Sequence, residues 1–161
     1  MKRLFVLSLV FFLLCGCENP KTVIPIMQSI SFTADVQYGD DNYQADANVR
    51  DDNLNLVVRR PEYIDGLTLN INKNGATASY KGISYPLDIS SQPQGAMAQV
   101  LYNVLSDVSG KQLNCGEENC EINGKVDNYS YTFVFSPSGL PISLTVDEIN
   151  LLVKFSNVSL N

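Results

Sequence analysis

Alternation of apolar and polar residues is the feature that most constrains the fold of this chain. Apolar side chains occupy every second position from Ile30 to Tyr38, and the same period returns from Tyr129 to Phe135. Successive side chains of a strand point to opposite faces of its sheet, so this pattern predicts strands with one buried and one solvated face. Such strands are typical of antiparallel sheets, and we therefore expect a mainly β protein.

Turn signals divide the rest of the chain into further short strands. The cluster Gly39-Asp40-Asp41-Asn42 separates the first strand from a second, which we expect from Tyr43 to Val49. Asn74-Gly75 is a strong hairpin signal, because both central residues of a type I′ turn need a positive φ. A second pair of this kind, Asn123-Gly124, predicts another turn. In all we expect about nine strands.

A change of period predicts one helix. From Met97 to Val108 the apolar residues fall three or four positions apart, which places them on one stripe of an amphipathic helix over residues 94–108. Gly110 suits the end of such a helix. One helix covers only part of the apolar face of so many strands. The remaining apolar surface must therefore be covered by curling of the sheet or by a ligand.

Composition excludes several classes of function. The chain has no His, which removes Ser-His-Asp and Cys-His catalysis in their usual forms and also the usual zinc sites. The sequence contains no nucleophile with a base and no phosphate-binding loop, so we expect neither an enzyme nor a cofactor or metal. A formal net charge of −6 and the lack of a basic patch argue against nucleic acid as a partner.

The N-terminus has the layout of a secretory signal peptide. Lys2 and Arg3 precede the apolar run Leu4–Leu14, which is shorter than the ~20 apolar residues that a transmembrane helix needs. The run ends in Leu14-Cys15-Gly16-Cys17, which resembles the bacterial lipobox. The resemblance implies that Cys17 receives a diacylglyceryl group and becomes the first residue of the mature chain, with Cys15 as the weaker alternative. Two acyl chains, of the palmitate kind, suffice for a stable anchor.

These features divide the chain and give it an expected location. Residues 1–16 are the expected signal peptide, 17–27 the lipidated Cys and a tether, and 28–161 the folded domain. Removal of Lys2 and Arg3 with the leader changes the formal net charge from −6 to −8. We expect the mature protein on the extracytoplasmic face of the bacterial cell membrane. Its lipid holds it there, because an acidic protein is not attracted to anionic headgroups.

The two remaining cysteines, Cys115 and Cys120, are expected to form a disulfide. In an oxidising compartment such a pair is typical of a structural bridge. The residues between them can turn the chain, so we expect 112–115 and 120–122 to pair as a hairpin stapled by the bridge. A redox-active pair is the alternative, but the spacing is not C-x-x-C and no thioredoxin-like βαβ pattern surrounds it.

Four stretches show a characteristic succession of predicted strands and turns: FTADVQYGDDNYQADA, RRPEYIDGLTLNINKNGATASYKG, YTFVFSPSGLPISLTV and LLVKFSNV. Together they resemble the LolA/LppX-LprG superfamily of lipoprotein and lipid carriers. The resemblance implies a curved antiparallel half-barrel of about nine strands, packed on one amphipathic helix and enclosing an apolar cavity. Members of this family often place a helix before the first strand, whereas Pro20 and Pro25 argue against a helix in residues 18–27. The same fold with its cavity shrunk into an ordinary core is therefore the alternative.

From this resemblance and the one-sided strands, we expect a membrane-anchored extracytoplasmic lipoprotein that binds or carries an apolar ligand, a lipid, in a half-barrel cavity. The alternative is a structural or sensory envelope lipoprotein with a filled core, which acts through protein–protein contacts. The candidate ligand-lining residues belong to the alternating strands and the helix stripe: Phe32, Val36, Met97, Val100, Leu101, Val104, Leu105, Tyr131, Phe133 and Phe135.

Two kinds of charged cluster allow a functional interpretation beside a simpler one. Asp40-Asp41 and Asp51-Asp52 carry the oxygen ligands that calcium prefers, but they lack the spacing of an EF-hand loop, and we expect solvated turns. Arg59-Arg60, beside Pro61, could meet lipid headgroups. An exposed strand end is the simpler interpretation of this pair.

Overall fold

A computed structural model describes residues 22–24, 26, 28–87, 93–113, 115 and 118–160, with the side chains of the helix described from Met97 onward. The expected signal peptide, Cys15 and Cys17 lie outside the described residues, so their roles stay predictions. No helix in the described part of the chain is long and apolar enough to cross a membrane.

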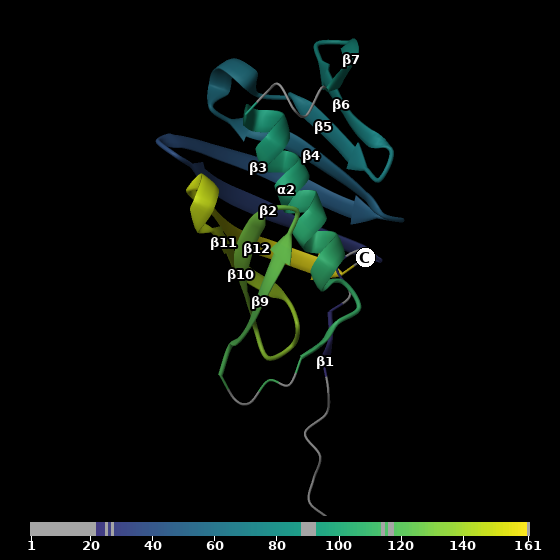
Figure 1. The fold of residues 1–161 in the computed structure, drawn as a ribbon. Helices are drawn as coiled ribbons and strands as arrows, with labels where there is room; N and C mark the ends of the chain where they lie inside the picture. Colours follow the sequence, from purple (N-terminus) through teal and green to yellow (C-terminus); the bar gives the residue numbers. More distant parts are fainter. Residues whose placement is uncertain are drawn as a thin grey trace, which may run out of the picture.

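Ten strands form one antiparallel sheet in the order β7-β6-β5-β4-β3-β2-β12-β11-β10-β9 (Figure 1). Most neighbours in this order are consecutive along the chain; only β12 returns to pair with β2 and joins the two halves of the sheet. The strands are β2 (Ser29–Tyr38), β3 (Asp41–Arg50), β4 (Asn53–Arg60), β5 (Thr68–Asn72), β6 (Gly75–Tyr80), β7 (Ile83–Leu87), β9 (Cys120–Val126), β10 (Tyr129–Phe135), β11 (Pro141–Val146) and β12 (Leu151–Leu160). The expected mainly β class is confirmed.

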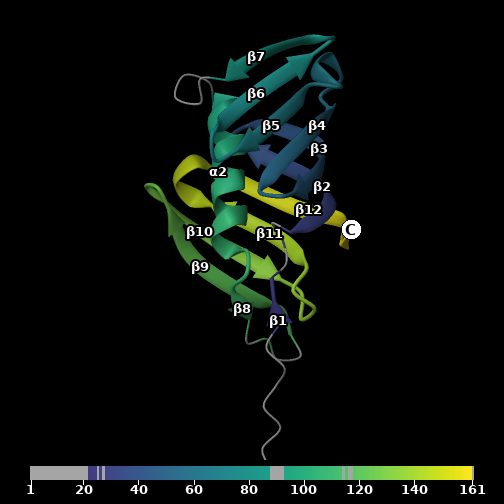
Figure 2. The ribbon, with the colours of Figure 1, turned by 90° about the vertical axis from the view of Figure 1, so that its right-hand side faces the viewer.

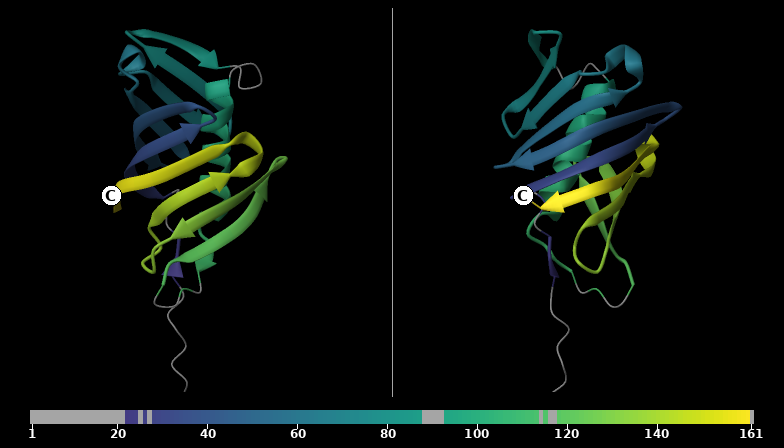
Figure 3. Two further views of the ribbon diagram at one scale, coloured as in Figure 1. Left: turned by 90° about the vertical axis from the view of Figure 1, so that its left-hand side faces the viewer. Right: turned by 180° about the vertical axis from the view of Figure 1, so that it is seen from behind.

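The sheet curves around helix α2 (Pro93–Val108), which lies along its concave face (Figure 2). The helix contacts both β5 and β9, which stand far apart in the strand order, so the sheet wraps around it. The convex face of the sheet points away from the helix (Figure 3). Two 3₁₀ turns, Glu62–Ile64 (η1) and Asp147–Ile149 (η2), connect β4 to β5 and β11 to β12. The helix predicted over 94–108 is confirmed.

The core forms between the concave face and the helix stripe, as the alternation requires. In β2 the side chains of Ile30, Phe32, Ala34 and Val36 are buried, and the residues between them are not. Among the described residues no polar or charged residue is buried. The cohesion of the core therefore comes mainly from hydrophobic burial and close packing.

The folded domain begins earlier than residue 28, where the sequence analysis placed it. A two-stranded sheet pairs β1 (Thr22–Val23) with β8 (Gln112–Leu113). Ile24 and Ile26 follow it and are fully buried in the core. Ile24 donates its backbone N–H to Lys111 and accepts from Gly110, at 3.0 and 2.7 Å. Pro20 and Pro25 argue against a helix in this segment, but they do not prevent Ile24 and Ile26 from packing into the core.

The hairpin expected from 112–115 and 120–122 does not form, because β8 pairs with β1 and β9 pairs with β10. The turn expected at Asn123-Gly124 is wrong too, since both residues lie within β9. The chain turns instead at Asp127, whose φ is 52°. Gly124 pairs with Tyr131, and a Cβ on Gly124 would lie 2.3 Å from the Tyr131 ring. The glycine is needed here for close packing beneath an aromatic ring, and not for a turn.

Candidate functional site

An apolar cavity of about 40 Å³ lies between α2 and the half of the sheet that contains β2 to β5. Its lining comes from four strands, from η1 and the residues after it, and from the helix. The lining residues are Ala34, Val36, Tyr43, Ala45, Leu56, Val58, Ile64, Leu67, Leu69, Met97 and Leu101. None of these side chains is charged, so an occupant would have to be apolar.

Three of the ten residues predicted to line an apolar site, Val36, Met97 and Leu101, lie on this cavity. The other seven are also buried, but they pack elsewhere in the core. Phe133 for example stacks between Phe135 and Phe155, with ring centroids 4.3 and 5.4 Å away. These seven are Phe32, Val100, Val104, Leu105, Tyr131, Phe133 and Phe135.

Sequence reasoning missed the lining residues of β3 to β5 and of η1. The alternation did show that Ala45, Leu56 and Leu69 face inward. It did not show over which strands the helix leaves a gap, because that depends on where α2 crosses the curved sheet. Ile64 had no period to mark it, since it lies in a short 3₁₀ turn.

The cavity is much smaller than a typical ligand pocket of roughly 300–1,000 Å³. Its 40 Å³ exceeds the space for one water molecule, ~10–15 Å³, but the site lacks the several polar partners that an ordered water needs. An acyl chain would fit only if the helix moved away from the strands. Tyr43, Ile64 and Leu67 are the lining residues that are partly exposed, so the cavity approaches the surface there.

Polar contacts fasten α2 to the sheet in its C-terminal half. Asn103 donates to Asp127 at 2.8 Å, and the Tyr131 hydroxyl donates to the Asp107 carboxylate. Midway along the helix, the Tyr102 hydroxyl donates to the backbone oxygen of Asp52 at 3.2 Å. Within residues 97–101, no described side chain forms a hydrogen bond with a described residue of the sheet. In this stretch Met97, Val100 and Leu101 are buried and belong to the hydrophobic core between the helix and the sheet.

The Asp107–Tyr131 contact shifts the pKa values of its two groups in opposite directions. Partial burial opposes ionisation of Asp107, but hydrogen bonds from Lys111 and Tyr131 and the charge of Lys111 outweigh it and lower the pKa of Asp107. Burial, then the hydrogen bond to Asp107 and its negative charge, raise the pKa of Tyr131 well above its ordinary value. The folded state therefore favours a charged Asp107 and a neutral Tyr131.

We expect Tyr131→Phe to change how stability depends on pH. A depressed Asp pKa contributes stability that is lost as pH falls through the acid range, and a raised Tyr pKa contributes stability that is lost as pH rises above ~10. The stability advantage of the wild type over Tyr131→Phe should therefore be largest near neutral pH and shrink at both ends. Urea unfolding at a series of pH values measures it; an advantage that grows above pH ~10 would contradict this assignment.

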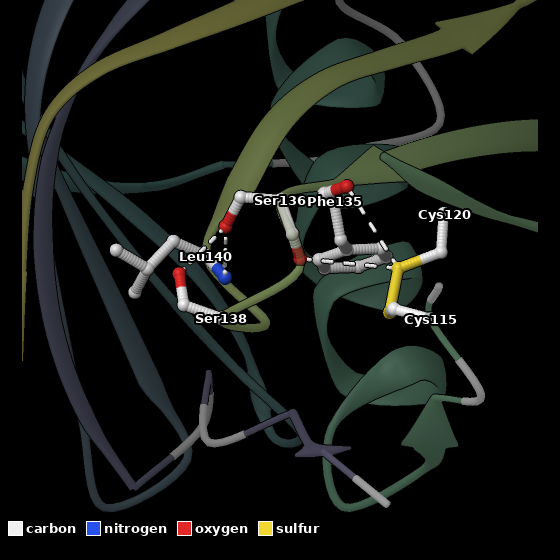
Figure 4. The surroundings of a disulfide bond; sticks show 6 residues. All are labelled: Cys115, Cys120, Phe135, Ser136, Ser138 and Leu140. Atoms are coloured by element: carbon white, nitrogen blue, oxygen red, sulfur yellow. Dashed lines mark hydrogen bonds between the residues drawn. A yellow bond between two sulfur atoms is a disulfide. The ribbon is translucent and has the colours of Figure 1, made fainter. Parts of the chain in front are cut away.

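The disulfide between Cys115 and Cys120 is present, with Cα atoms 5.3 Å apart (Figure 4). Cys115 lies in the loop after β8, and Cys120 is the first residue of the edge strand β9. The Sγ atom of Cys120 lies 3.8 Å from the backbone oxygens of Phe135 and Ser136. The bridge thus fastens the loop to the end of β9 next to the β10–β11 turn.

Replacing both cysteines by Ser should leave the fold intact and cost at most about 2 kcal/mol, because the closed loop is short. Urea unfolding of the double variant measures the cost. Thiol labelling of the folded wild type should find neither Cys115 nor Cys120 reactive. Two freely labelled thiols, or a loss of the β-sheet signal in the double variant, would contradict the structural role.

Three of the four clustered aspartates lie in turns, and the fourth, Asp41, is the first residue of β3. Asp51 and Asp52 connect β3 to β4 with φ values of 50° and 60°, and their side chains are exposed, as are those of Asp40 and Asp41. In the described part of the chain, no group of three or more His, Cys, Asp or Glu side chains is placed to hold a metal ion.

No protein-family model matches the chain, and no curated protein matches it. Among solved structures, it is similar to the crystal structure of a LolA superfamily protein from Nitrosomonas europaea. The similarity covers 86% of this chain and 89% of that chain, with a TM-score of 0.41 and 9% sequence identity. At this level the similarity assigns neither a ligand nor a partner to this chain.

Proposed function

We propose that this chain is a lipid-anchored extracytoplasmic protein that binds an apolar ligand, the acyl chain of a lipid, between α2 and strands β2 to β5. The observation that carries the proposal is the wholly uncharged cavity that Met97 and Leu101 of the helix line together with apolar residues of the sheet. The partly exposed residues Tyr43, Ile64 and Leu67 would form its entrance.

Binding would proceed by displacement of the N-terminal half of α2 while its C-terminal half stays fastened. Met97 and Leu101 would exchange their contacts with the sheet for contacts with the ligand. Each methylene group buried in this way is worth about 0.8 kcal/mol. The site lacks charged partners, so a polar headgroup would remain outside at the entrance.

Filling the cavity tests the proposal. Ala45→Val adds two methyl groups to the lining and should weaken binding of a fluorescent fatty acid about tenfold, at ~0.8 kcal/mol for each group excluded. Ala47→Val is the matched control, because Ala47 is buried on the same face of β3 but does not line the cavity. It should cost about 1–3 kcal/mol of stability through overpacking and leave the affinity unchanged. Equal affinities of both variants and the wild type would contradict the site.

The anchor has its own test. Cys17→Ser removes the sulfur to which the diacylglyceryl group would attach, so it should abolish incorporation of radiolabelled palmitate and leave a precursor of unprocessed length. Cys15→Ser is the control and should be labelled normally. A Cys17→Ser protein that is still labelled and of mature length would overturn the assignment.

A second function is favoured by the small volume of the cavity. If the cavity cannot expand beyond its 40 Å³, it is too small for an acyl chain. The domain is then a structural or sensory envelope protein with a filled core, which acts through its outer surface. The two functions differ in whether any fatty acid binds to the wild type in the experiment above.

A further inference from the structure

A second, polar groove is lined mainly by side chains of β12, β2, β3 and β4 that alternate with the buried ones and therefore lie on the convex face of the sheet. Its volume is about 300 Å³, at the lower end of the range of ligand pockets. It extends over four adjacent strands, β12, β2, β3 and β4. The lining residues are Asp35, Val36, Gln37, Asn42, Tyr43, Gln44, Arg60, Leu152 and Lys154.

The strand register places four of these side chains in one row across the sheet. Lys154 pairs with Asp35, Asp35 with Gln44, and Gln44 with Arg60. Neighbouring strands lie about 4.8 Å apart, so the row spans roughly 14 Å from Lys154 to Arg60. A second row lies two residues away along the strands. In it Gln37 pairs with Leu152 on one side and with Asn42 on the other, and the side chains of Gln37 and Asn42 add two amides to the groove.

A β-bulge places Arg60 in this row. Val58 faces the core and pairs with Ala45, so strict alternation would turn Arg59 outward and Arg60 inward. The register shifts between Gln44 and Ala45, which leaves Arg59 as the extra residue and pairs Arg60 with Gln44. Both arginines are therefore exposed on the convex face. Bulges of this kind re-aim a side chain and are over-represented beside functional sites.

The two arginines have different partners. The Nε of Arg59 forms an ion pair with Asp46 at 2.7 Å. Neither Arg60 nor Lys154 is within ion-pair distance of a carboxylate in the described part of the chain. Asp35, the carboxylate in the row, accepts a hydrogen bond from the Gln44 amide at 2.8 Å. The groove thus holds two unpaired cations and one carboxylate, a local excess of positive charge on a chain with a net charge of −6.

We infer that this groove binds a small polyol phosphate. A guanidinium binds phosphate through two parallel N–H donors, and Arg60 at the end of the row can present them. Asp35 would repel an anion in the middle of the row but accepts hydrogen bonds from hydroxyl groups, and the amides of Gln37 and Asn42 can bind hydroxyls as well. The phosphate therefore lies at the Arg60 end and the hydroxyl groups toward Asp35.

Glycerol phosphate is the simplest ligand of this chemistry, and it has two sources: a soluble metabolite or the headgroup of phosphatidylglycerol. The lining residues of the groove all lie between Asp35 and Lys154, so protein from residue 18 onward contains the whole groove. Calorimetric titration with glycerol 3-phosphate tests the soluble source, with glycerol and inorganic phosphate as comparisons. Sedimentation with phosphatidylcholine vesicles, with and without phosphatidylglycerol, tests the headgroup.

Arg60→Gln and Arg59→Gln form a matched pair of variants, because they remove the same charge from adjacent residues and only Arg60 lines the groove. Loss of a hydrogen-bonded charge at the phosphate should weaken binding about tenfold in Arg60→Gln. Arg59→Gln should bind within about twofold of the wild type, since Arg59 is paired with Asp46. Binding of glycerol 3-phosphate with this difference supports a soluble ligand, and binding only to phosphatidylglycerol vesicles with the same difference supports a headgroup. Absence of binding in both experiments, or equal losses in both variants, would overturn the inference.

Discussion

Phe133→Ala should lower the free energy of unfolding by about 3–5 kcal/mol, which is the usual cost of removing a buried aromatic ring. Phe133 is fully buried and stacks with Phe135 on its own strand and with Phe155 on β12. Phe155 in turn meets Phe32 edge to face at 5.1 Å. The substitution would thus leave a cavity beneath β10 and β12, near the join of the two halves of the sheet, where the surrounding strands cannot collapse into it.

Urea unfolding followed by circular dichroism measures this loss. Tyr63→Ala is the control, because Tyr63 is 75% exposed and its removal should change stability by no more than about 0.5 kcal/mol. A cost below ~1 kcal/mol for Phe133→Ala would show that the aromatic cluster is not packed as described.

Gly124→Ala should destabilise the domain by about 1–3 kcal/mol, the usual cost of forcing extra atoms into a packed site. The new Cβ would lie 2.3 Å from the ring of Tyr131, a distance that no real contact allows. The ring cannot easily move away, since its hydroxyl donates to Asp107 on the helix. The strain would therefore reach both the edge strand β9 and the C-terminal end of α2.

A double-mutant cycle with Tyr131→Ala distinguishes this clash from a general effect of backbone entropy. With the ring absent, Gly124→Ala should cost little or become slightly favourable, because Ala restricts the unfolded chain more than Gly does. Gly66→Ala is the comparison for strain from a positive φ, since Gly66 has a φ of 82° and open space around its Cα. Additive costs of Gly124→Ala and Tyr131→Ala would contradict the clash.

The periodic parts of this fold could be predicted because burial repeats along them. The period of two in Ile30–Tyr38 and the three-and-four spacing in Met97–Val108 each follow from one face packed against the core. Asn123-Gly124 misled the prediction because a local turn signal competed with the register of β9 on β10, and the register prevailed. The N-terminal tether was misplaced for a related reason, since Ile24 and Ile26 are too few to show a period although both are buried.

The two candidate sites could be predicted only in part. The apolar character of the interior follows from the alternation, but the location of the 40 Å³ cavity depends on the angle between helix and sheet. The convex groove depends on a single extra residue in β4, and nothing in Val57-Val58-Arg59-Arg60 distinguishes a bulge from plain alternation. The cavity thus depends on how the helix lies on the sheet, and the groove depends on a break in the alternation of β4.

Native mass spectrometry of protein from residue 18 onward, purified from a lipid-containing host, tests whether the half-barrel holds an apolar ligand between α2 and strands β2 to β5. We predict a population heavier than the bare chain by the mass of a fatty acid or lipid, released on collisional activation and diminished in Ala45→Val but not in Ala47→Val. Bare chain alone, in a wild type that also fails to take up added fatty acid, would contradict the proposed function and favour the filled core.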